Sequence, residues 1–277
     1  MRFAGLLISM RPVHIARMNF CGNCRKVGVD SRRYIKCAME VPNGQSRQIK
    51  MRMIGLSRGS GLSKRLTLAA MSLGFGVVQL DVTIVNTALN SIGTSLGGGV
   101  SQLQWIVSAY TIAFAALILT AGALGDRLGA KRIFMAGFAV FTVASLGCAL
   151  APTSTMLIAA RAVQGVGAAI LVPNSLSLLN HAYPEETERG RAVGLWLAGA
   201  SVALTAGPPV GGALIALVGW RSIFLVNLPI GLAGLWLTWR YTIDTPRANR
   251  EVDLLGQAAA VGALGTLAAA LIEGGPP

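Results

Sequence analysis

The sequence predicts an all-α membrane protein with seven membrane-spanning helices. Hydrophobic residues make up 53% of the 277 residues and charged residues make up 13%, whereas soluble domains carry about 25% charged residues. The apolar residues form long runs of the length needed to cross a bilayer. The charged residues gather in the short segments between those runs. Together these observations are typical of a polytopic membrane protein.

We divide the chain into three parts. Residues 1–62 form a basic tail, residues 63–241 form a six-span bundle, and residues 242–277 form a cytoplasmic linker and a seventh span. The net charge of +13 belongs mostly to the tail, because residues 1–65 hold 14 of the 24 basic residues and only 2 of the 11 acidic ones. The predicted spans are residues 66–89, 104–124, 133–150, 156–179, 192–218, 222–239 and 254–272.

The tail has two interpretations that remain open. It is either a disordered cytoplasmic extension or a stretch that precedes the true start at Met51 or Met53, and we favour the second. Its positive charge alone does not predict binding to nucleic acid, since no aromatic pattern or motif accompanies it.

A metal site in the tail is not predicted. Cys21 and Cys24 have the spacing of one zinc-binding pair, with Cys37 and His14 nearby. One such pair with scattered partners is weak support for zinc. Whether the three cysteines bind metal therefore stays open.

The connecting segments predict the orientation of the chain. Cytoplasmic loops of membrane proteins are enriched in Lys and Arg. The outer turns carry Arg221 alone. The inner loops carry Arg127, Lys131, Arg132, Arg189, Arg191, Arg240, Arg247 and Arg250. We therefore expect a multi-pass protein of the inner (plasma) membrane with a cytoplasmic amino terminus and, after seven spans, an outer carboxyl end.

Two charged side chains lie well away from the loops, Asp81 in the first span and Arg161 in the fourth. Charge inside a span is costly and marks a functional site by default. Gln164 shares a helix face with Arg161. The structural alternatives are that Asp81 is hydrated near its helix end and that Arg161 pairs with backbone carbonyls or extends to the outer interface. We favour a functional role for these residues.

The loop between the second and third spans is a tight polar turn, and its glycines permit sharp turning. Its distinctive residues are Gly122, Asp126, Arg127, Gly129, Lys131 and Arg132. In the fifth span, small residues recur every fourth position from Gly199 to Gly211, which predicts a ridge for close packing of a partner helix. Pro208 and Pro209 lie beside this ridge and favour a kink.

Four motifs resemble those of the major facilitator superfamily. The loop Gly122–Arg132 resembles its signature loop, and Leu80–Leu89 is similar to the first-span motif of its fourteen-span drug:proton antiporters. Arg161-x-x-Gln164-Gly165-x-Gly167 resembles the fourth-span motif, and Gly207-Pro208-x-x-Gly211-Gly212 resembles the fifth-span motif of exporters. Asn90 stands where that family usually has proline, and Ala203 replaces a glycine often found there. The resemblance covers about residues 62–277.

The resemblance implies a major-facilitator-type six-helix amino-terminal bundle plus a seventh span. It also implies a proton-coupled secondary transporter that exports small apolar or cationic compounds. The implied roles are proton coupling by Asp81, Arg161 and Gln164; a conformational switch in the loop Gly122–Arg132; and an exporter helix kink at Gly207, Pro208, Gly211 and Gly212.

The expected partners are a small-molecule substrate, protons and the lipid bilayer, without nucleic acid, cofactor or metal. No glycine-rich phosphate-binding loop followed by Lys-Ser or Lys-Thr occurs, which argues against ATP-driven pumping. Both histidines, His14 and His181, lie outside the spans. No catalytic residue is predicted, and we do not expect an enzyme.

The family resembled here folds as two six-span bundles, with two extra spans between them in the fourteen-span branch. We therefore expect this chain to be a fragment or a truncated product that lacks a second bundle or a second chain. The alternative is a truncated non-transporting membrane remnant or an assembly partner. A homodimer that rebuilds the cavity is a third option.

Overall fold

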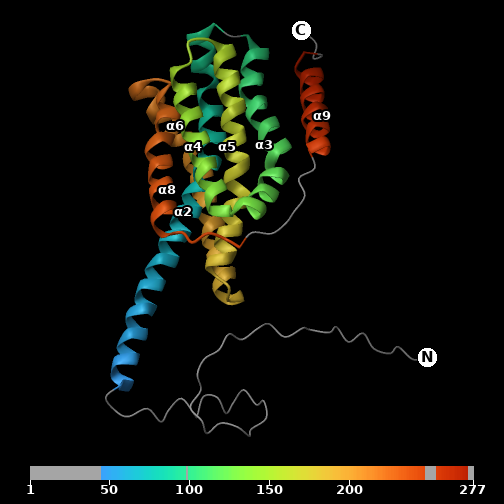
Figure 1. The fold of residues 1–277 in the computed structure, drawn as a ribbon. Coiled ribbons are helices and arrows are strands. Elements are labelled where there is room, and N and C mark those ends of the chain that lie inside the picture. Colours follow the sequence, from blue (N-terminus) through green and yellow to red (C-terminus); the bar gives the residue numbers. More distant parts are fainter. Residues whose placement is uncertain (1–44, 98, 247–253, 274–277) are drawn as a thin grey trace, which may run out of the picture. The chain divides into compact units, whose positions relative to one another are not determined.

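A computed structural model describes residues 45–97, 99–246 and 254–273, and all regular structure in these ranges is helical. The chain forms two units, Met1–Ile54 and Gly55–Pro277, and the bundle described below belongs to the second. The helices (Figure 1) are α2 Gln45–Leu96, α3 Val100–Leu128, α4 Ala130–Leu150, α5 Ser154–Ala182, α6 Glu186–Val218, α7 Ser222–Leu225, α8 Asn227–Tyr241 and α9 Leu254–Glu273.

Six described helical segments are long and apolar enough to cross a membrane: Gly61–Leu96, Val100–Leu128, Ala130–Leu150, Ser154–Ala182, Glu186–Val218 and Ser222–Tyr241. Each of the first six predicted spans lies inside one of these segments. The predicted seventh span forms α9, and its crossing of a membrane stays a prediction. Helix α2 begins at Gln45, so it includes residues that the sequence pattern placed in the tail. The tail cysteines and His14 lie outside the described residues.

Glycine and threonine mark the turns between spans. Gly129 separates α3 from α4 with φ 102°, and Gly219 follows α6 with φ 99°. Positive φ angles of this kind are accessible to glycine without steric cost. At the start of α5, the Thr153 side chain accepts a hydrogen bond from the Met156 backbone N–H at 3.3 Å, which is an ordinary N-terminal cap. These local features allow short connections between consecutive helices.

Helices α3, α4 and α5 approach one another at glycines. A Cβ atom on Gly167 of α5 would lie 2.7 Å from the backbone nitrogen of Phe141 on α4. A Cβ atom on Gly165 would meet the Tyr110 carbonyl of α3 and lie 3.0 Å from Ala113 Cβ. Small residues at helix contacts permit such close backbone packing in membranes. The fourth span is therefore held tightly between the second and third.

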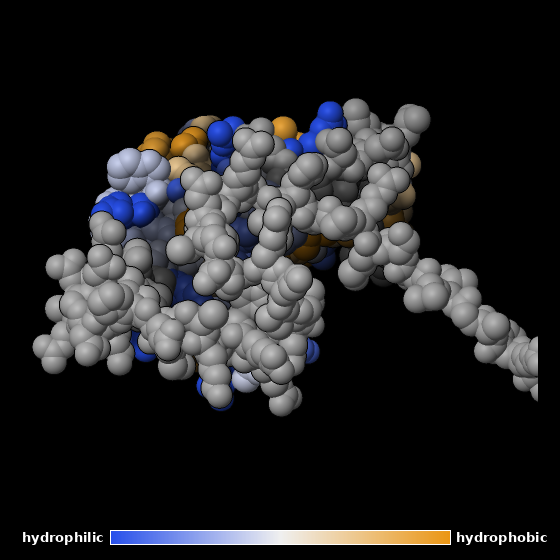
Figure 2. Space-filling view, turned by 60° about the horizontal axis from the view of Figure 1, so that its bottom comes forward, coloured by the Kyte–Doolittle hydropathy of each residue, from blue (hydrophilic) through white to orange (hydrophobic). Residues whose placement is uncertain are grey.

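Large apolar side chains are exposed on the outside of the bundle, as a lipid-facing surface requires. Leu119 is 84% exposed and Leu217 is 82% exposed. Figure 2 shows hydrophobic (orange) beside hydrophilic (blue) residues on the coloured part of the surface. In a six-span bundle this exposed apolar area replaces the polar coat of a soluble protein.

Candidate functional site

The bundle core is divided into two apolar clusters with a polar layer between them. On α2, one cluster includes Val77 and Val78 and the other begins at Ile84. Asp81 lies between these positions and is 0% exposed. The clusters follow in reverse order along α5, where Arg161 and Gln164 follow Leu157 of the second cluster and precede Ala168 of the first. The charged residues therefore sit at one level inside the span region.

The Asp81 carboxylate accepts hydrogen bonds from three side chains. Arg161 Nη1 donates to Oδ2 and forms a buried ion pair. Gln164 Nε2 donates to Oδ1 at 2.8 Å, and Asn227 Nδ2 donates to the same oxygen at 3.0 Å. The donors come from α5 and α8, so the carboxylate of α2 joins three helices. A buried carboxylate tolerates its charge through such pairing.

Arg161 has further partners besides Asp81. Its Nε donates to the Ile106 carbonyl at 3.3 Å and its Nη1 donates to Gln164 Oε1 at 2.8 Å. The guanidinium carbon lies 4.2 Å from the centre of the Tyr110 ring, a cation–π arrangement. With 1% of its surface exposed, Arg161 does not extend to the interface. The backbone pairing weighed as an alternative occurs together with the ion pair.

Gln164 connects the ion pair to α4. Its Nε2 donates to Ser145 Oγ at 2.9 Å, and Ser145 Oγ in turn donates to the Phe141 carbonyl at 2.7 Å. Cys148 Sγ lies 3.6 Å from Gln164 Oε1. Both ends of the Gln164 amide are thus engaged, which fixes its orientation.

The structure brings the three predicted coupling residues together and adds Asn227, Ser145 and Tyr110 to them. Asp81 contacts Arg161 both directly and through Gln164. The signal for Asn227 in the sequence is an amide inside the apolar run of the sixth span, followed by Pro229. Sequence reasoning missed it because one asparagine in a span carries no information about which helix it faces.

The loop residues of the predicted switch lie at the carboxyl-terminal end of α3 and the start of α4. A Cβ atom on Gly122 would lie 3.5 Å from Pro173 Cβ of α5, and a Cβ atom on Gly125 would overlap the Asn174 side chain. Asp126 is partly buried and Arg127 is exposed. The close approach to α5 explains why glycine is needed at position 125, whereas a methyl group at position 122 would make an ordinary van der Waals contact.

A segment that sequence reasoning overlooked caps α4. The Lys131 backbone N–H donates to Asp244 Oδ1 at 3.0 Å, and the Ala130 N–H donates to Thr245 Oγ1 at 3.0 Å. Arg132 Nε lies 3.9 Å from Asp244 Oδ2. A carboxylate at a helix amino terminus satisfies free N–H groups and the helix dipole. The residues after α8 therefore hold the loop between α3 and α4.

The predicted small-residue ridge of α6 packs against α2. A Cβ atom on Gly207 would overlap Thr83, and one on Gly211 would lie 2.8 Å from Ile84 Cγ1. Around Gly212 nothing lies within 4 Å, and Pro208 is exposed. Thus two of the four predicted kink residues make the helix contact. The other two face away from it.

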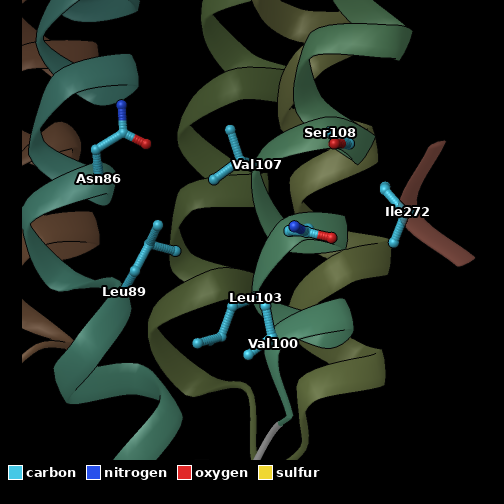
Figure 3. A pocket seen from close by; sticks show the side chains of 8 residues that line it. Asn86, Leu89, Val100, Leu103, Val107, Ser108 and Ile272 are labelled. Carbon is cyan, nitrogen blue, oxygen red and sulfur yellow. The ribbon is translucent and has the colours of Figure 1, made fainter. Parts of the chain in front are cut away.

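An open groove of about 630 Å³ lies beside the carboxyl-terminal part of α2 and the amino-terminal part of α3, with Ile272 of α9 also in its lining (Figure 3). Its lining is mainly apolar, with the polar side chains of Asn86, Gln104 and Ser108. The groove does not include the Asp81 cluster. Among the described residues, no group of three or more His, Cys, Asp or Glu side chains could hold a metal ion.

Comparison with known proteins gives the relationships of the chain. A family model described as Major Facilitator Superfamily matches residues 71–272. Over 207 residues the chain is 46% identical to "Methylenomycin A resistance protein" of Streptomyces coelicolor, which covers 75% of this chain and 44% of that protein. It is 43% identical over 210 residues to "Multidrug resistance protein Stp" of Mycobacterium tuberculosis, which covers 76% of this chain and 39% of that protein. It is 37% identical over 212 residues to "Drug efflux pump JefA" of the same species, which covers 76% of this chain and 42% of that protein. The chain therefore spans less than half the length of these curated relatives.

Proposed function

This chain belongs to the Major Facilitator Superfamily, and from that membership we propose that it is one bundle of a proton-coupled exporter of small apolar or cationic compounds. The names of the relatives, resistance proteins and a drug efflux pump, support export of such compounds. The buried Asp81–Arg161 ion pair is the main observation that supports the proposed proton coupling.

The physical reason lies in the cost of buried charge. Removing one partner of a buried pair leaves an uncompensated charge that costs about 3–5 kcal/mol. When a proton neutralises Asp81, Arg161 keeps its charge, and its remaining partners are the oxygens of Gln164 and Ile106 and the Tyr110 ring. Relief of that cost requires the helices that carry these groups to rearrange. Protonation of one side chain can thereby drive a change in the bundle.

Exposed polar side chains on α2 and α6 support the proposal that another bundle or chain lines the transport path opposite this one. Asn86, Thr87 and Asn90 are exposed on α2, and Ser201 and Thr205 are exposed on α6. Polar groups facing hydrocarbon are unfavourable, so such residues usually face a cavity or another part of the protein. We propose that this surface faces a second bundle or a second chain. The alternative function is a non-transporting membrane remnant or an assembly partner.

The orientation is also a proposal. The basic residues of the loops support a cytoplasmic amino terminus, because cytoplasmic loops are enriched in Lys and Arg. The described inner end carries Lys131 and Arg132, whereas Arg221 lies at the other end of the bundle between α6 and α7. Accessibility of cysteines placed in these loops to a membrane-impermeant reagent tests this orientation.

The experiment for transport uses everted vesicles from cells that express the complete protein, with this bundle and its second bundle or chain, and ethidium as the apolar cation. Addition of ethidium should release part of an imposed proton gradient. Asp81→Asn should abolish this release, and Asp81→Glu should keep part of it. Glu188→Gln is the matched control, since Glu188 is a carboxylate half-exposed at the bundle end. Unchanged coupling in Asp81→Asn contradicts the mechanism, and no ethidium response in the unmodified protein favours the non-transporting alternative.

A further inference from the structure

Asn227 is the one partner of Asp81 that comes from the sixth span. Its Nδ2 donates to Asp81 Oδ1 at 3.0 Å, and the residue is 0% exposed. Its own carbonyl oxygen, Oδ1, is buried without a hydrogen-bond partner. A buried polar atom left unsatisfied costs about 1–3 kcal/mol. The asparagine is therefore held at a cost that an apolar side chain of similar size would avoid.

The position of Asn227 is set by packing on both sides of it. It is the first residue of α8, after a break at Val226 that separates α8 from the short α7. Pro229 lies in the first turn of α8, where a missing N–H is tolerated. Phe224 of α7 is buried in one apolar cluster. On α8, a Cβ on Gly234 would overlap the Phe138 ring of α4. The packing of α7 and α8 therefore fixes the position of Asn227 next to Asp81.

The two ends of the amide match the two protonation states of a carboxyl group. An ionised carboxylate only accepts hydrogen bonds, whereas a protonated one also donates. In the structure Nδ2 faces the carboxylate, the orientation that an ionised Asp81 requires. The unpartnered Oδ1 is an acceptor available to a protonated Asp81 after rotation of the amide. No other partner of Asp81 offers a free acceptor in the described residues, because Gln164 Oε1 already accepts from Arg161.

We propose that Asn227 is a positioning residue that holds Asp81 in both protonation states and couples its proton exchange to the sixth span. It holds the ionised state more strongly, because a hydrogen bond to a charged carboxylate is stronger than one to a neutral carboxyl group. This inference rests on the proposed function of Asp81. The charged and titratable groups around Asp81 are Arg161 of α5, Tyr110 of α3 and Cys148 of α4. Helices α6, α7 and α8 contribute none at this level. The amide is therefore the contribution of α8 to the proton site.

The test follows the carboxyl infrared signal of Asp81 during a pH titration of the full chain in lipid vesicles. The signal is identified as the part that Asp81→Asn removes. Loss of a donor to the ionised form favours the protonated form. We compare the pH at which half of the carboxyl signal remains. In Asn227→Ala we expect this pH to be about one unit higher than in the unmodified protein, which corresponds to a tenfold change in proton affinity. Asn227→Gln, which keeps the amide, should restore part of the difference.

The matched control is Asn174→Ala. Asn174 is also a buried asparagine, but it donates to the Ala121 and Ile170 carbonyls and does not contact Asp81. Both alanine variants should lose stability, and only Asn227→Ala should shift the titration. Equal titrations for the two variants overturn the inference, while ethidium-dependent proton release lost in Asp81→Asn still supports the proposed function. An Asp81 signal that does not titrate in the unmodified protein overturns both.

Discussion

The backbone N–H of Lys131 donates to the Asp244 carboxylate at 3.0 Å across 113 residues of sequence. The residue that follows the sixth span thereby caps the helix of the third. Asp244 Oδ1 also accepts from the Thr245 backbone N–H at 3.0 Å, which orders the capping residue itself. The Lys131 side chain donates to the Trp239 carbonyl at 3.1 Å. The loop of the second and third spans and the end of the sixth form one structure at this end of the bundle.

This cap predicts the effect of Asp244→Ala. Removing a side chain that caps a helix amino terminus costs about 0.5–2 kcal/mol. We expect a lower unfolding midpoint in detergent and faster proteolysis in the segment 242–246. Asp244→Asn keeps an acceptor and should lose less. Equal stability of the unmodified protein and Asp244→Ala would show that the cap contributes nothing.

The ridge on α6 provides a comparison between two neighbouring glycines. In Gly207→Ala the added methyl group overlaps Thr83, whereas in Gly212→Ala it meets open space. Overpacking a tight contact costs about 1–3 kcal/mol, so Gly207→Ala should lower the unfolding midpoint and Gly212→Ala should leave it nearly unchanged. Thermal unfolding of the two purified variants measures this. A larger loss in Gly212→Ala would contradict the α2–α6 contact.

The buried ion pair predicts a non-additive pair of substitutions. Arg161→Met leaves Asp81 buried without its cation and should cost about 3–5 kcal/mol. The double variant Arg161→Met with Asp81→Asn removes both charges and should recover a large part of that loss. Comparing the yield and unfolding midpoint of the two single variants with those of the double variant gives the coupling energy. Additive losses would show that the two charges do not interact.

A surface ion pair should matter much less. Lys64 Nζ lies 2.9 Å from Glu188 Oε2, with 37% and 53% of the two side chains exposed. Exposed pairs of this kind contribute about 0–1 kcal/mol and are weakened by salt. Glu188→Gln should therefore change the unfolding midpoint by little, and any change should disappear in concentrated salt. A loss as large as that of Arg161→Met would mean that the pair has a further role.

Much of the fold was predictable because the apolar runs identify the spans directly. The first six of the seven predicted spans lie within helices long and apolar enough to cross a membrane, and the hydropathy of each run was sufficient to predict them. The residues of the buried ion pair could also be identified from the sequence, since Asp81 and Arg161 are the isolated charges of the spans. Family membership then confirmed the resemblance that the motifs indicated.

The contacts between distant segments were not predictable from pattern alone. Asp244 looked like part of a polar linker, because nothing in the sequence shows that it reaches the start of α4. Asn227 was one amide in an apolar run, and its partner lies 146 residues away. The start of α2 was also missed, because a basic segment has no apolar period to mark a helix. In each case the missing information was which residues meet in three dimensions.

The order of the partners of Asp81 along the chain has a consequence for synthesis. Arg161 follows Asp81 by 80 residues and Asn227 follows it by 146. At about 5–20 residues per second, the ribosome makes the first span several seconds before the arginine. During that interval none of the three side chains that bind the Asp81 carboxylate in the folded bundle has been made. Since a lone charge in hydrocarbon is unfavourable, protonation of Asp81 or contact with water would lower the cost of inserting the first span until the fourth span arrives.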